Sequence, residues 1–353
     1  ADGRATPDRL ATSPSGEPVT TKDVTLPSGR AVPPPGWLRG RDLLSSADVS
    51  SAELAALLDA AIALKAARAA GARYAPGRPL EGRAVALLFD RPSLRTRASF
   101  EVGTRWLGGH SVDLSGGGVG LGTRESVPDV GRVLDRLFDA VVVRTPSQAA
   151  VTELAHVAEI PVINALTDVE HPCQALADLL TIRERLGRLE GVVLAFVGDG
   201  NNVFHSLALA GALAGMEVRI AHPDGYAPSD GIVEKARAIA AGSGGRIVLG
   251  GDPREAVADA DVVYTDAWTS MGQEAEAAAR RTAFREYVVD EALLSAAPDH
   301  AIVMHCLPAH RGEEIVDAVI DGPRSAVFDQ AENRLHAQDA LLAAILGDDE
   351  AER

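Results

Sequence analysis

The stretch that decides the fold is Ala84–Phe89, AVALLF, with the loop and helix start that follow it at 90–97, DRPSLRTR. Six consecutive apolar residues predict a strand that is buried on both faces, as strands of parallel sheets are. Residues 97–102 then predict the opening of a helix. A strand that runs directly into a helix is the repeating unit of α/β proteins, so this junction predicts a parallel sheet covered by helices.

The same unit recurs along the rest of the chain. Ser50 and Glu53 predict a helix cap in front of an Ala-rich amphipathic helix over 54–70. Seven further apolar runs alternate with helical patterns, and each predicts a strand; they are 140–143, 162–165, 192–197, 217–221, 246–249, 262–265 and 301–305. This alternation predicts parallel sheets with helices on both faces.

The length of the chain predicts two domains, because 353 residues exceed what one ordinary core contains. We place the boundary in the helix that begins near Pro172, ahead of a second strand-and-turn unit at 192–202. Residues 1–35 are rich in Pro, Gly, Ser and Thr, which predicts a flexible extension. Its acidic residues fit neither a secretory signal nor a transit peptide, so we expect a cytoplasmic protein.

The composition excludes several classes of partner. The 34 basic and 50 acidic residues give a net charge of −16, which argues against nucleic acid or an anionic membrane. No apolar run approaches the roughly 18 residues of a membrane-spanning helix. Cys173 and Cys306 are the only cysteines, and the sequence has no CxxC pair or His/Cys cluster. We therefore expect a reducing compartment and no zinc site.

A local group of cations follows the first strand. Arg95 and Arg97 offer guanidiniums, and Ser93 and Thr96 offer hydroxyls, at the start of a helix. Free backbone N–H groups and the positive end of the helix dipole make such a junction a favourable phosphate site. Taken alone, the run is equally consistent with a solvated basic helix start.

Four other segments place polar residues at predicted strand ends or helix starts; they are 171–174 (HPCQ), 266–273 (DAWTSMGQ), 305–308 (HCLP) and 332–334 (ENR). Each has a structural alternative. His171 could be a buried histidine, Asp266 a helix cap and Cys306 a small apolar filler. If all these structural alternatives were true, it would be a coincidence that every one of the segments lies at a strand end or helix start where ligands bind. We therefore interpret the segments as one site.

The turn after the strand 192–197 has part of a dinucleotide-binding pattern. Gly198 and Gly200 match its first two glycines, but Val203 occupies the place of the third. Asn201 and Asn202, which follow the turn, suit a different task. They are placed to hold a small polar substrate at the carboxyl end of the strand.

These motifs together resemble the aspartate/ornithine carbamoyltransferase family, from about residue 37 to residue 346. The run 93–97 resembles the family's carbamoyl-phosphate loop, and 196–206 resembles its ornithine-contacting segment. Residues 171–174, 266–272 and 305–308 are similar to its HPCQ, D-x-W-x-S-M-G and HCLP patterns. Two positions depart from the family: Leu94 replaces the usual loop threonine, and Gly120 stands where a glutamine is frequent.

The resemblance implies two parallel-sheet α/β lobes. They are a carbamoyl-phosphate-binding domain over 36–171 and a Rossmann-like ornithine-binding domain over 172–328. A C-terminal helix over 329–347 is expected to return to the first lobe. The implied reaction transfers the carbamoyl group of carbamoyl phosphate to the side-chain amine of L-ornithine, which gives L-citrulline and phosphate without a metal or cofactor.

The resemblance also assigns the site residues. The catalytic set is Arg95, Arg144, His171 and Cys306. The carbamoyl-phosphate-binding set is Ser93, Leu94, Arg95, Thr96, Arg144, His171, Gln174, Cys306, Leu307 and Arg334. The ornithine-binding set is Asn202, Asp266, Ser270 and Met271. In this assignment Cys306 contacts the attacking amine and helps to manage its proton, and Gly272 lets its loop close over the substrate.

Three alternatives stay open at this point. The acceptor could be a related amine, either putrescine or an N-acylornithine, and Leu94 weakly favours the latter. The chain could also be a non-catalytic paralogue. The resemblance further implies a homotrimer or a multiple of trimers, although the sequence shows no interface.

Overall fold

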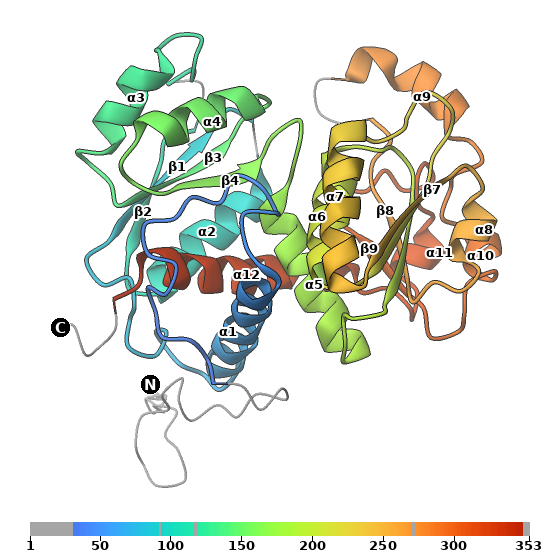
Figure 1. Cartoon of the computed structure of the whole chain (residues 1–353), viewed down its shortest axis with the longest axis horizontal. Helices are drawn as coiled ribbons and strands as arrows, with labels where there is room; N and C mark the ends of the chain where they lie inside the picture. The colour runs from blue at the N-terminus through green and yellow to red at the C-terminus, as the bar shows by residue number, and fades with distance from the viewer. Residues whose placement is uncertain (1–30, 92, 116–118, 270–272, 349–353) are drawn as a thin grey trace, which may run out of the picture.

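The protein is described from a computed structural model that covers residues 31–91, 93–115, 119–269 and 273–348. Two parallel sheets lie side by side, and helices pack around each sheet (Figure 1). The predicted fold class, two parallel-sheet α/β lobes, is confirmed. None of the helices in these ranges has the length and apolarity needed to cross a bilayer.

The first sheet has the strand order β2-β1-β3-β4, and all neighbouring strands are parallel. The strands are β1 Ala84–Phe89, β2 His110–Asp113, β3 Ala140–Arg144 and β4 Val162–Leu166. The helices of this half are α1 Ser51–Ala69, α2 Leu94–Trp106, α3 Val127–Leu134 and α4 Gln148–Val157. Strand β3 is buried along its whole length because helices cover both faces of the sheet.

The second sheet has the order β7-β6-β5-β8-β9 and is also parallel throughout. The strands are β5 Val193–Val197, β6 Glu217–Ala221, β7 Arg246–Gly250, β8 Val262–Thr265 and β9 Ile302–His305. Its helices are α6 Asn202–Leu213, α7 Asp230–Ser243, α8 Pro253–Val257, α9 Ala277–Ala283, α10 Glu291–Leu294 and α11 Asp317–Ile320, with the 3-10 turn η2 Glu274–Glu276.

All eight predicted strands are present, each within one residue of its predicted ends. Strand β2 was not predicted. It lies at the edge of the first sheet, and its sequence HSVD is mostly exposed. An edge strand of this kind buries little surface, so it leaves no apolar run in the sequence.

Of the predicted helix starts, that of α1 is confirmed and that of α2 is wrong. Helix α1 begins with the predicted capping box: the Ser50 side chain accepts from the Glu53 N–H, and the Glu53 carboxylate accepts from the Ser50 N–H at 2.7 Å. Helix α2, in contrast, begins at Leu94 and not at Arg97, with Ser93 as its N-cap. The first turn of α2 therefore carries Arg95 and Thr96.

Helices α5 Pro172–Leu186 and α12 Val327–Leu346 join the two halves (Figure 1). Helix α5 packs against β4 of the first half and α6 of the second. Helix α12 packs against α1, α2 and α5, and it also contacts β9. The expected return of the last helix to the first lobe is confirmed, whereas the domain limits at 36, 172 and 329 stay predictions.

Candidate active site

Most of the predicted site residues lie at the carboxyl ends of the two sheets. Arg144 is the last residue of β3, and His171 follows β4 as the N-cap of α5. Asp266 follows β8 and Cys306 follows β9. The carboxyl ends of parallel strands meet at one edge of a sheet, which is where open α/β sheets bind ligands.

Arg334 supplies the remaining cation from α12, and it is buried. Its Nη1 donates to Gln174 Oε1 at 2.6 Å, and its Nη2 donates to Thr96 Oγ1 at 2.9 Å. Within the described ranges Arg334 forms no ion pair with a carboxylate. Residues that are far apart in the sequence, on α2, α5 and α12, thus hold one guanidinium in place.

Two further guanidiniums lie near Arg334. Burial lowers the pKa of Arg144 to about 10, and the neighbouring Arg334 and Arg95 contribute to that shift. Burial also lowers the pKa of Arg95, while Cys306 and Asp266 act in the opposite direction. All three arginines stay cationic at neutral pH. Their mutual repulsion makes this a favourable place for an anion.

His171 lies beside these arginines. Burial lowers its pKa well below the usual value, and Arg334, Arg144 and Arg95 lower it further, so the ring is neutral at pH 7. Its Nδ1 has no hydrogen-bond partner among the described residues, whereas its backbone N–H donates to Ser206 Oγ at 2.7 Å. A neutral imidazole can donate one hydrogen bond without adding a fourth positive charge. We call Arg95, Arg144, Arg334 and His171 the arginine group.

Arg97 does not belong to this group. It pairs with Glu101 and Asp113, at 3.0 Å in each case, on the exposed face of α2. The expectation that Arg97 helps Arg95 to bind an oxyanion is therefore wrong, because the helix begins three residues earlier than predicted and turns Arg97 outward. Leu94 is also directed outward and is 79% exposed. Ser93, the N-cap, makes no capping hydrogen bond with its side chain.

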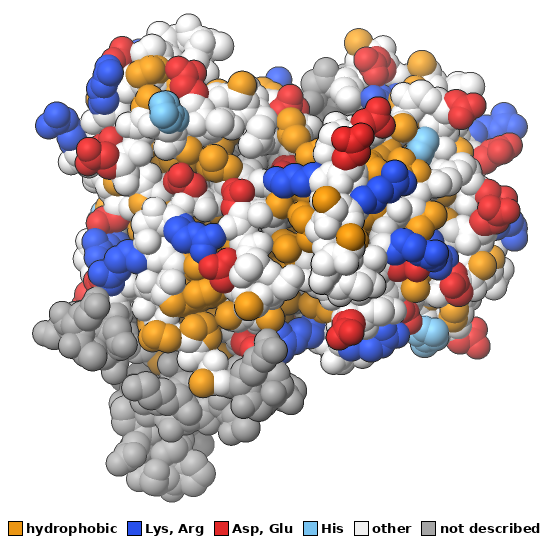
Figure 2. Space-filling model, viewed as in Figure 1, with side chains coloured by type: hydrophobic (Ala, Val, Ile, Leu, Met, Phe, Trp, Pro, Cys, Tyr) orange, Lys and Arg blue, Asp and Glu red, His pale blue; other side chains and the backbone are white. Residues whose placement is uncertain are grey.

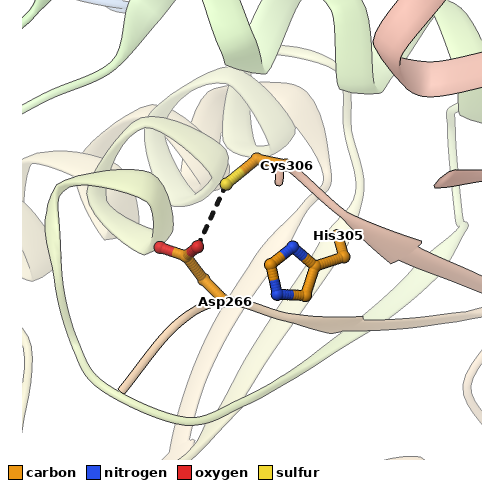
Figure 3. Close-up of side chains that lie close together, drawn as sticks. All are labelled: Asp266, His305 and Cys306. Carbon is orange, nitrogen blue, oxygen red and sulfur yellow. Dashed lines mark hydrogen bonds between the residues drawn. The ribbon is translucent and has the colours of Figure 1, made fainter. Parts of the chain in front are cut away.

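Asp266, Asn201 and Cys306 form a second group, which we call the carboxylate group. Strands β8 and β9 pair with Thr265 opposite His305, which brings the residues that follow them together. The Cys306 thiol donates to Asp266 Oδ1 at 3.1 Å (Figure 3), and Asn201 Nδ2 donates to Asp266 Oδ2 at 2.8 Å. Arg95 lies close to Asp266 and Cys306: both raise its pKa, and Arg95 in turn acts to lower the pKa of Cys306. The arginine group and the carboxylate group are therefore adjacent.

Cys306 is a neutral thiol in this setting. Burial raises its pKa well above the usual value, and the adjacent Asp266 carboxylate raises it further. A thiol that keeps its proton can donate a hydrogen bond but does not act as a thiolate base or nucleophile. Its expected part in managing the proton of an amine stays a prediction.

The structure also brings Asp266 close to His305 and Cys306, which are adjacent in the sequence, so that three potential metal ligands lie together. Ligand atoms of Asp266, His305 and Cys306 all lie within 4.8 Å of one another (Figure 3). However, His305 Nδ1 accepts from the Leu307 N–H at 2.9 Å, and Nε2 lies 3.0 Å from Glu314 Oε1. Both ring nitrogens are therefore already engaged, so these residues fit a hydrogen-bonded cluster better than a metal centre.

The two asparagines after β5 have different contacts. Asn201 caps α6, because its Oδ1 accepts from the backbone N–H groups of Val203 and Phe204. Asn202, the predicted ornithine ligand, donates to the Thr167 carbonyl at 2.6 Å and is only partly buried. The role of Asn201 beside Asp266 was not predicted; its position as a helix N-cap after a Gly-rich turn is the signal that indicates it.

The remaining predicted residues divide into two sets. Leu307 lies next to Cys306 with a φ of +57°, in the left-handed region, and the peptide bond to Pro308 is cis. Ser270 and Met271, predicted to bind ornithine, and Gly272 lie outside the described residues. Gly120 has a φ of +57°, which accounts for a glycine where the family often has glutamine.

A pocket of about 230 Å³ lies elsewhere, between α1, α5 and α6. Its lining consists of Ser51, Leu54, Ala55, Leu58, Arg183, Arg188, Leu189, Leu213 and Ala214. It contains none of the predicted site residues, and its two arginines pair with carboxylates, Arg183 with Asp59 and Arg188 with Asp261. Elsewhere on the molecule, acidic and basic side chains are interspersed on the face shown in Figure 2.

Comparison with known families agrees with this geometry. Residues 41–184 match the model of the aspartate/ornithine carbamoyltransferase carbamoyl-P binding domain, and residues 190–345 match that of the Asp/Orn binding domain. A curated relative from Parafrankia sp., named ornithine carbamoyltransferase, is 55% identical over 309 residues, which cover 88% of this chain and 97% of the relative. The chain belongs to the aspartate/ornithine carbamoyltransferase family.

Other members of this carbamoyltransferase family give the same result. The ornithine carbamoyltransferase of Anoxybacillus flavithermus is 52% identical over 88% of this chain and 98% of its own. The solved structure of the ornithine carbamoyltransferase from Pyrococcus furiosus has a TM-score of 0.85 and 48% identity, with 88% of this chain and 98% of that chain covered. The resemblance inferred from the sequence motifs is thus confirmed.

Proposed function

We propose that this protein transfers the carbamoyl group of carbamoyl phosphate to the side-chain amine of L-ornithine, which gives L-citrulline and phosphate. The observation that carries the proposal is the arginine group around a neutral histidine, directly beside the carboxylate group. The first arrangement suits a phosphate dianion with a carbonyl, and the second suits a substrate that carries an α-ammonium group. The names of the family's ornithine enzymes support the same acceptor.

In this proposal the arginine group binds carbamoyl phosphate. Arg95 and Arg144, with the N-terminal N–H groups of α2 and the Ser93 hydroxyl, hold the phosphate. Arg334, held by Gln174 and Thr96, completes the positive environment. The neutral His171 donates to the carbamoyl oxygen, where negative charge develops as the amine attacks. Leu307 and Cys306 supply backbone carbonyls for the carbamoyl NH₂.

The reaction proceeds by direct displacement. The neutral side-chain amine of ornithine forms a bond to the carbamoyl carbon, the carbon–oxygen bond to phosphate breaks, and phosphate leaves with the electron pair. The amine loses one proton, for which the departing phosphate is an acceptor. Asp266, with Ser270, binds the α-ammonium group, while Asn202 and Met271 bind the carboxylate. Positioning and charge provide the catalysis, without a covalent enzyme intermediate.

A citrulline assay tests the proposal. The purified protein is given carbamoyl phosphate with L-ornithine, putrescine, N-acetylornithine or L-aspartate, and the carbamoylated product is measured for each amine. We expect L-ornithine to be preferred by about a hundredfold or more, because Asp266 requires a free α-ammonium group. If another amine is preferred, that amine is the acceptor in place of L-ornithine. If no amine gives a product, the protein is a non-catalytic paralogue.

We also propose a homotrimer, or a multiple of trimers, in the cytoplasm. The exposed apolar side chains of Leu94 and Val102 on α2 support association through the first half of the chain. The two cysteines are free, which supports a reducing compartment. Light scattering coupled to size-exclusion chromatography tests the oligomer, since a trimer has three times the mass of the chain.

A further inference from the structure

We propose that Asp178 is a positioning residue. By fixing the side-chain amides of Gln174 and Gln330, it holds the arginine group and the carboxylate group in fixed positions relative to each other. The inference rests on the proposed function for what the site does. Asp178 lies on α5, one turn after Gln174, and is completely buried. Among the described residues of the predicted binding sets, its hydrogen bonds reach only Gln174.

The Asp178 carboxylate accepts three hydrogen bonds. Its Oδ1 accepts from Gln174 Nε2 at 2.8 Å and from Gln330 Nε2 at 2.7 Å, and its Oδ2 accepts from the Tyr264 hydroxyl at 3.1 Å. Burial raises the pKa of Asp178 to about 7, although its three donors and the nearby Arg334 act in the opposite direction. The three donors that face it, and the charge of Arg334, favour the ionised carboxylate.

An ionised carboxylate can only accept, so both glutamines must turn their NH₂ groups toward it. Their carbonyl oxygens then face the site. The Gln174 oxygen accepts from Arg334 Nη1 at 2.6 Å, and the Gln330 oxygen accepts from the His305 N–H at 2.9 Å. If either amide were reversed, its NH₂ would face another donor. Asp178 thus sets one contact in the arginine group and one immediately before Cys306.

The third donor extends the connection to β8. Tyr264 lies two residues before Asp266, and its ring stacks on Phe196 of β5 with 5.4 Å between the centroids. The partners of Asp178 therefore come from α5, α12 and β8. The charged or titratable groups that face it are Arg334, Tyr264 and Cys306. One buried carboxylate connects the elements on which both substrates depend.

The indirect contact has a physical advantage. A carboxylate paired directly with Arg334 would compete with the phosphate for that guanidinium. The Gln174 amide lies between Asp178 and Arg334, so the charge of the Asp178 carboxylate polarises the Gln174 oxygen that accepts from Arg334. The carboxylate itself stays out of the anion site. Arg334 is held firmly and keeps its charge for the substrate.

The test replaces Asp178 by its neutral isostere. In Asp178→Asn, the new NH₂ group must face either the Tyr264 hydroxyl or a glutamine NH₂, so one partner loses its acceptor. We expect kcat/KM for carbamoyl phosphate at pH 8 to fall by about tenfold or more, mainly through KM. The matched control is Asp339→Asn on α12, which also removes a buried carboxylate with a pKa of about 7, but one that pairs with Arg68. We expect its kcat and KM to stay within about twofold of wild type.

A double-mutant cycle separates positioning from a general loss of stability. Gln330→Met removes the contacts of Gln330 with Asp178, Tyr264 and His305. If Asp178 acts in part through Gln330, the defect of the double variant is smaller than the product of the two single defects, whereas independent defects multiply. If Asp178→Asn does not fold, Tyr264→Phe and Gln330→Met carry the test, and both must lower kcat/KM by more than Asp339→Asn. Equal effects in Asp178→Asn and Asp339→Asn, or multiplying defects, would overturn the proposal.

Calorimetry with inorganic phosphate separates this inference from the proposed function. Phosphate binding requires no turnover, so it can be measured even if the wild-type protein makes no citrulline, a result that would overturn only the proposed function. We expect phosphate to bind Asp178→Asn about fivefold or more weakly than wild type, because Arg334 loses its fixed orientation. Unchanged binding would show that Asp178 does not position Arg334. Tighter binding would show that it acts only as a distant negative charge, and either result would overturn the inference.

Discussion

The arginine group and the carboxylate group carry opposite charges and are assembled in different ways. The arginine group gathers two buried guanidiniums, from β3 and α12, and the partly buried guanidinium of Arg95 from α2, and these cations repel one another. The carboxylate group needs only three neighbouring strands of one sheet, because the segments that follow β5, β8 and β9 place Asn201, Asp266 and Cys306 together. A binding site for a doubly charged anion therefore depends on long-range packing, whereas a site for an amine can be built locally.

The largest effect is expected on the arginine side. In Arg95→Ala, kcat/KM for carbamoyl phosphate should fall by about a thousandfold, because a partly buried cation that is proposed to bind the phosphate is lost. The melting temperature should not fall with it, since the repulsion that Arg95 exerts on Arg144 and on Arg334 is removed. Steady-state kinetics and thermal unfolding measure the two effects.

Arg97→Ala is the matched control for this change. Arg97 lies two residues further along the same helix, but it pairs with Glu101 and Asp113 on the outer face. Its removal should alter kcat/KM by less than about twofold, as expected for exposed ion pairs. Equal losses in the two variants would show that the division between inner and outer arginines is wrong.

On the carboxylate side, Asp266→Asn should lower kcat/KM for L-ornithine by about a hundredfold, because a charged hydrogen bond to the α-ammonium group is lost. The KM for carbamoyl phosphate should change by less than about threefold. Initial rates with each substrate varied in turn measure both values. A larger change for carbamoyl phosphate than for ornithine would mean that the two groups do not act separately.

The reactivity of the thiols provides a smaller effect. Burial raises the pKa of Cys173 to about 12, and burial together with Asp266 raises the pKa of Cys306 well above its usual value. Because only the thiolate reacts, iodoacetamide at pH 7.5 should alkylate both residues about tenfold or more slowly than in the urea-unfolded chain. The rate should rise as the pH increases above 9. Rapid labelling of Cys306 at pH 7.5, followed by mass spectrometry, would contradict the neutral thiol.

The smallest effect is expected at Leu94. Leu94→Thr restores the hydroxyl that the family usually has, yet the Leu94 side chain is directed outward. The KM for carbamoyl phosphate should therefore change by less than about threefold, because the backbone N–H at this position is already present. A tenfold decrease would show that the first turn of α2 reorients when the substrate binds.

The strands were predictable because parallel strands are buried on both faces, so runs such as 140–143 and 217–221 mark them directly. The exposed edge strand His110–Asp113 has no such mark. The start of α2 was misplaced for a similar reason. Ser93 is an ordinary N-cap residue, but Leu94 and Arg95 continue neither an apolar nor an acidic first turn, so the helix pattern becomes visible only at Arg97.

The site was predictable where a residue lies at the end of a strand, as for His171, Asp266 and Cys306. It was less so where a contact depends on helix packing. Arg97 looked equivalent to Arg95, although the two lie about half a helical turn apart and so on different faces of α2. Asp178 and Gln330 gave no signal because their importance lies in partners that are far away in the sequence. A carboxylate within the otherwise apolar run 175–180 is the feature of the sequence that could have drawn attention to Asp178.

Helix α12 has a consequence for synthesis. It carries Arg334 and Gln330, and it is translated after both sheets. A chain that stops before residue 334 would lack Arg334 and most of α12, whose buried residues Leu341, Leu342 and Ile345 belong to the same core as α1 and β1. The last helix to be made therefore completes both the arginine group and part of the core of the first half. The order of elements along the chain delays the chemistry until the fold is nearly complete.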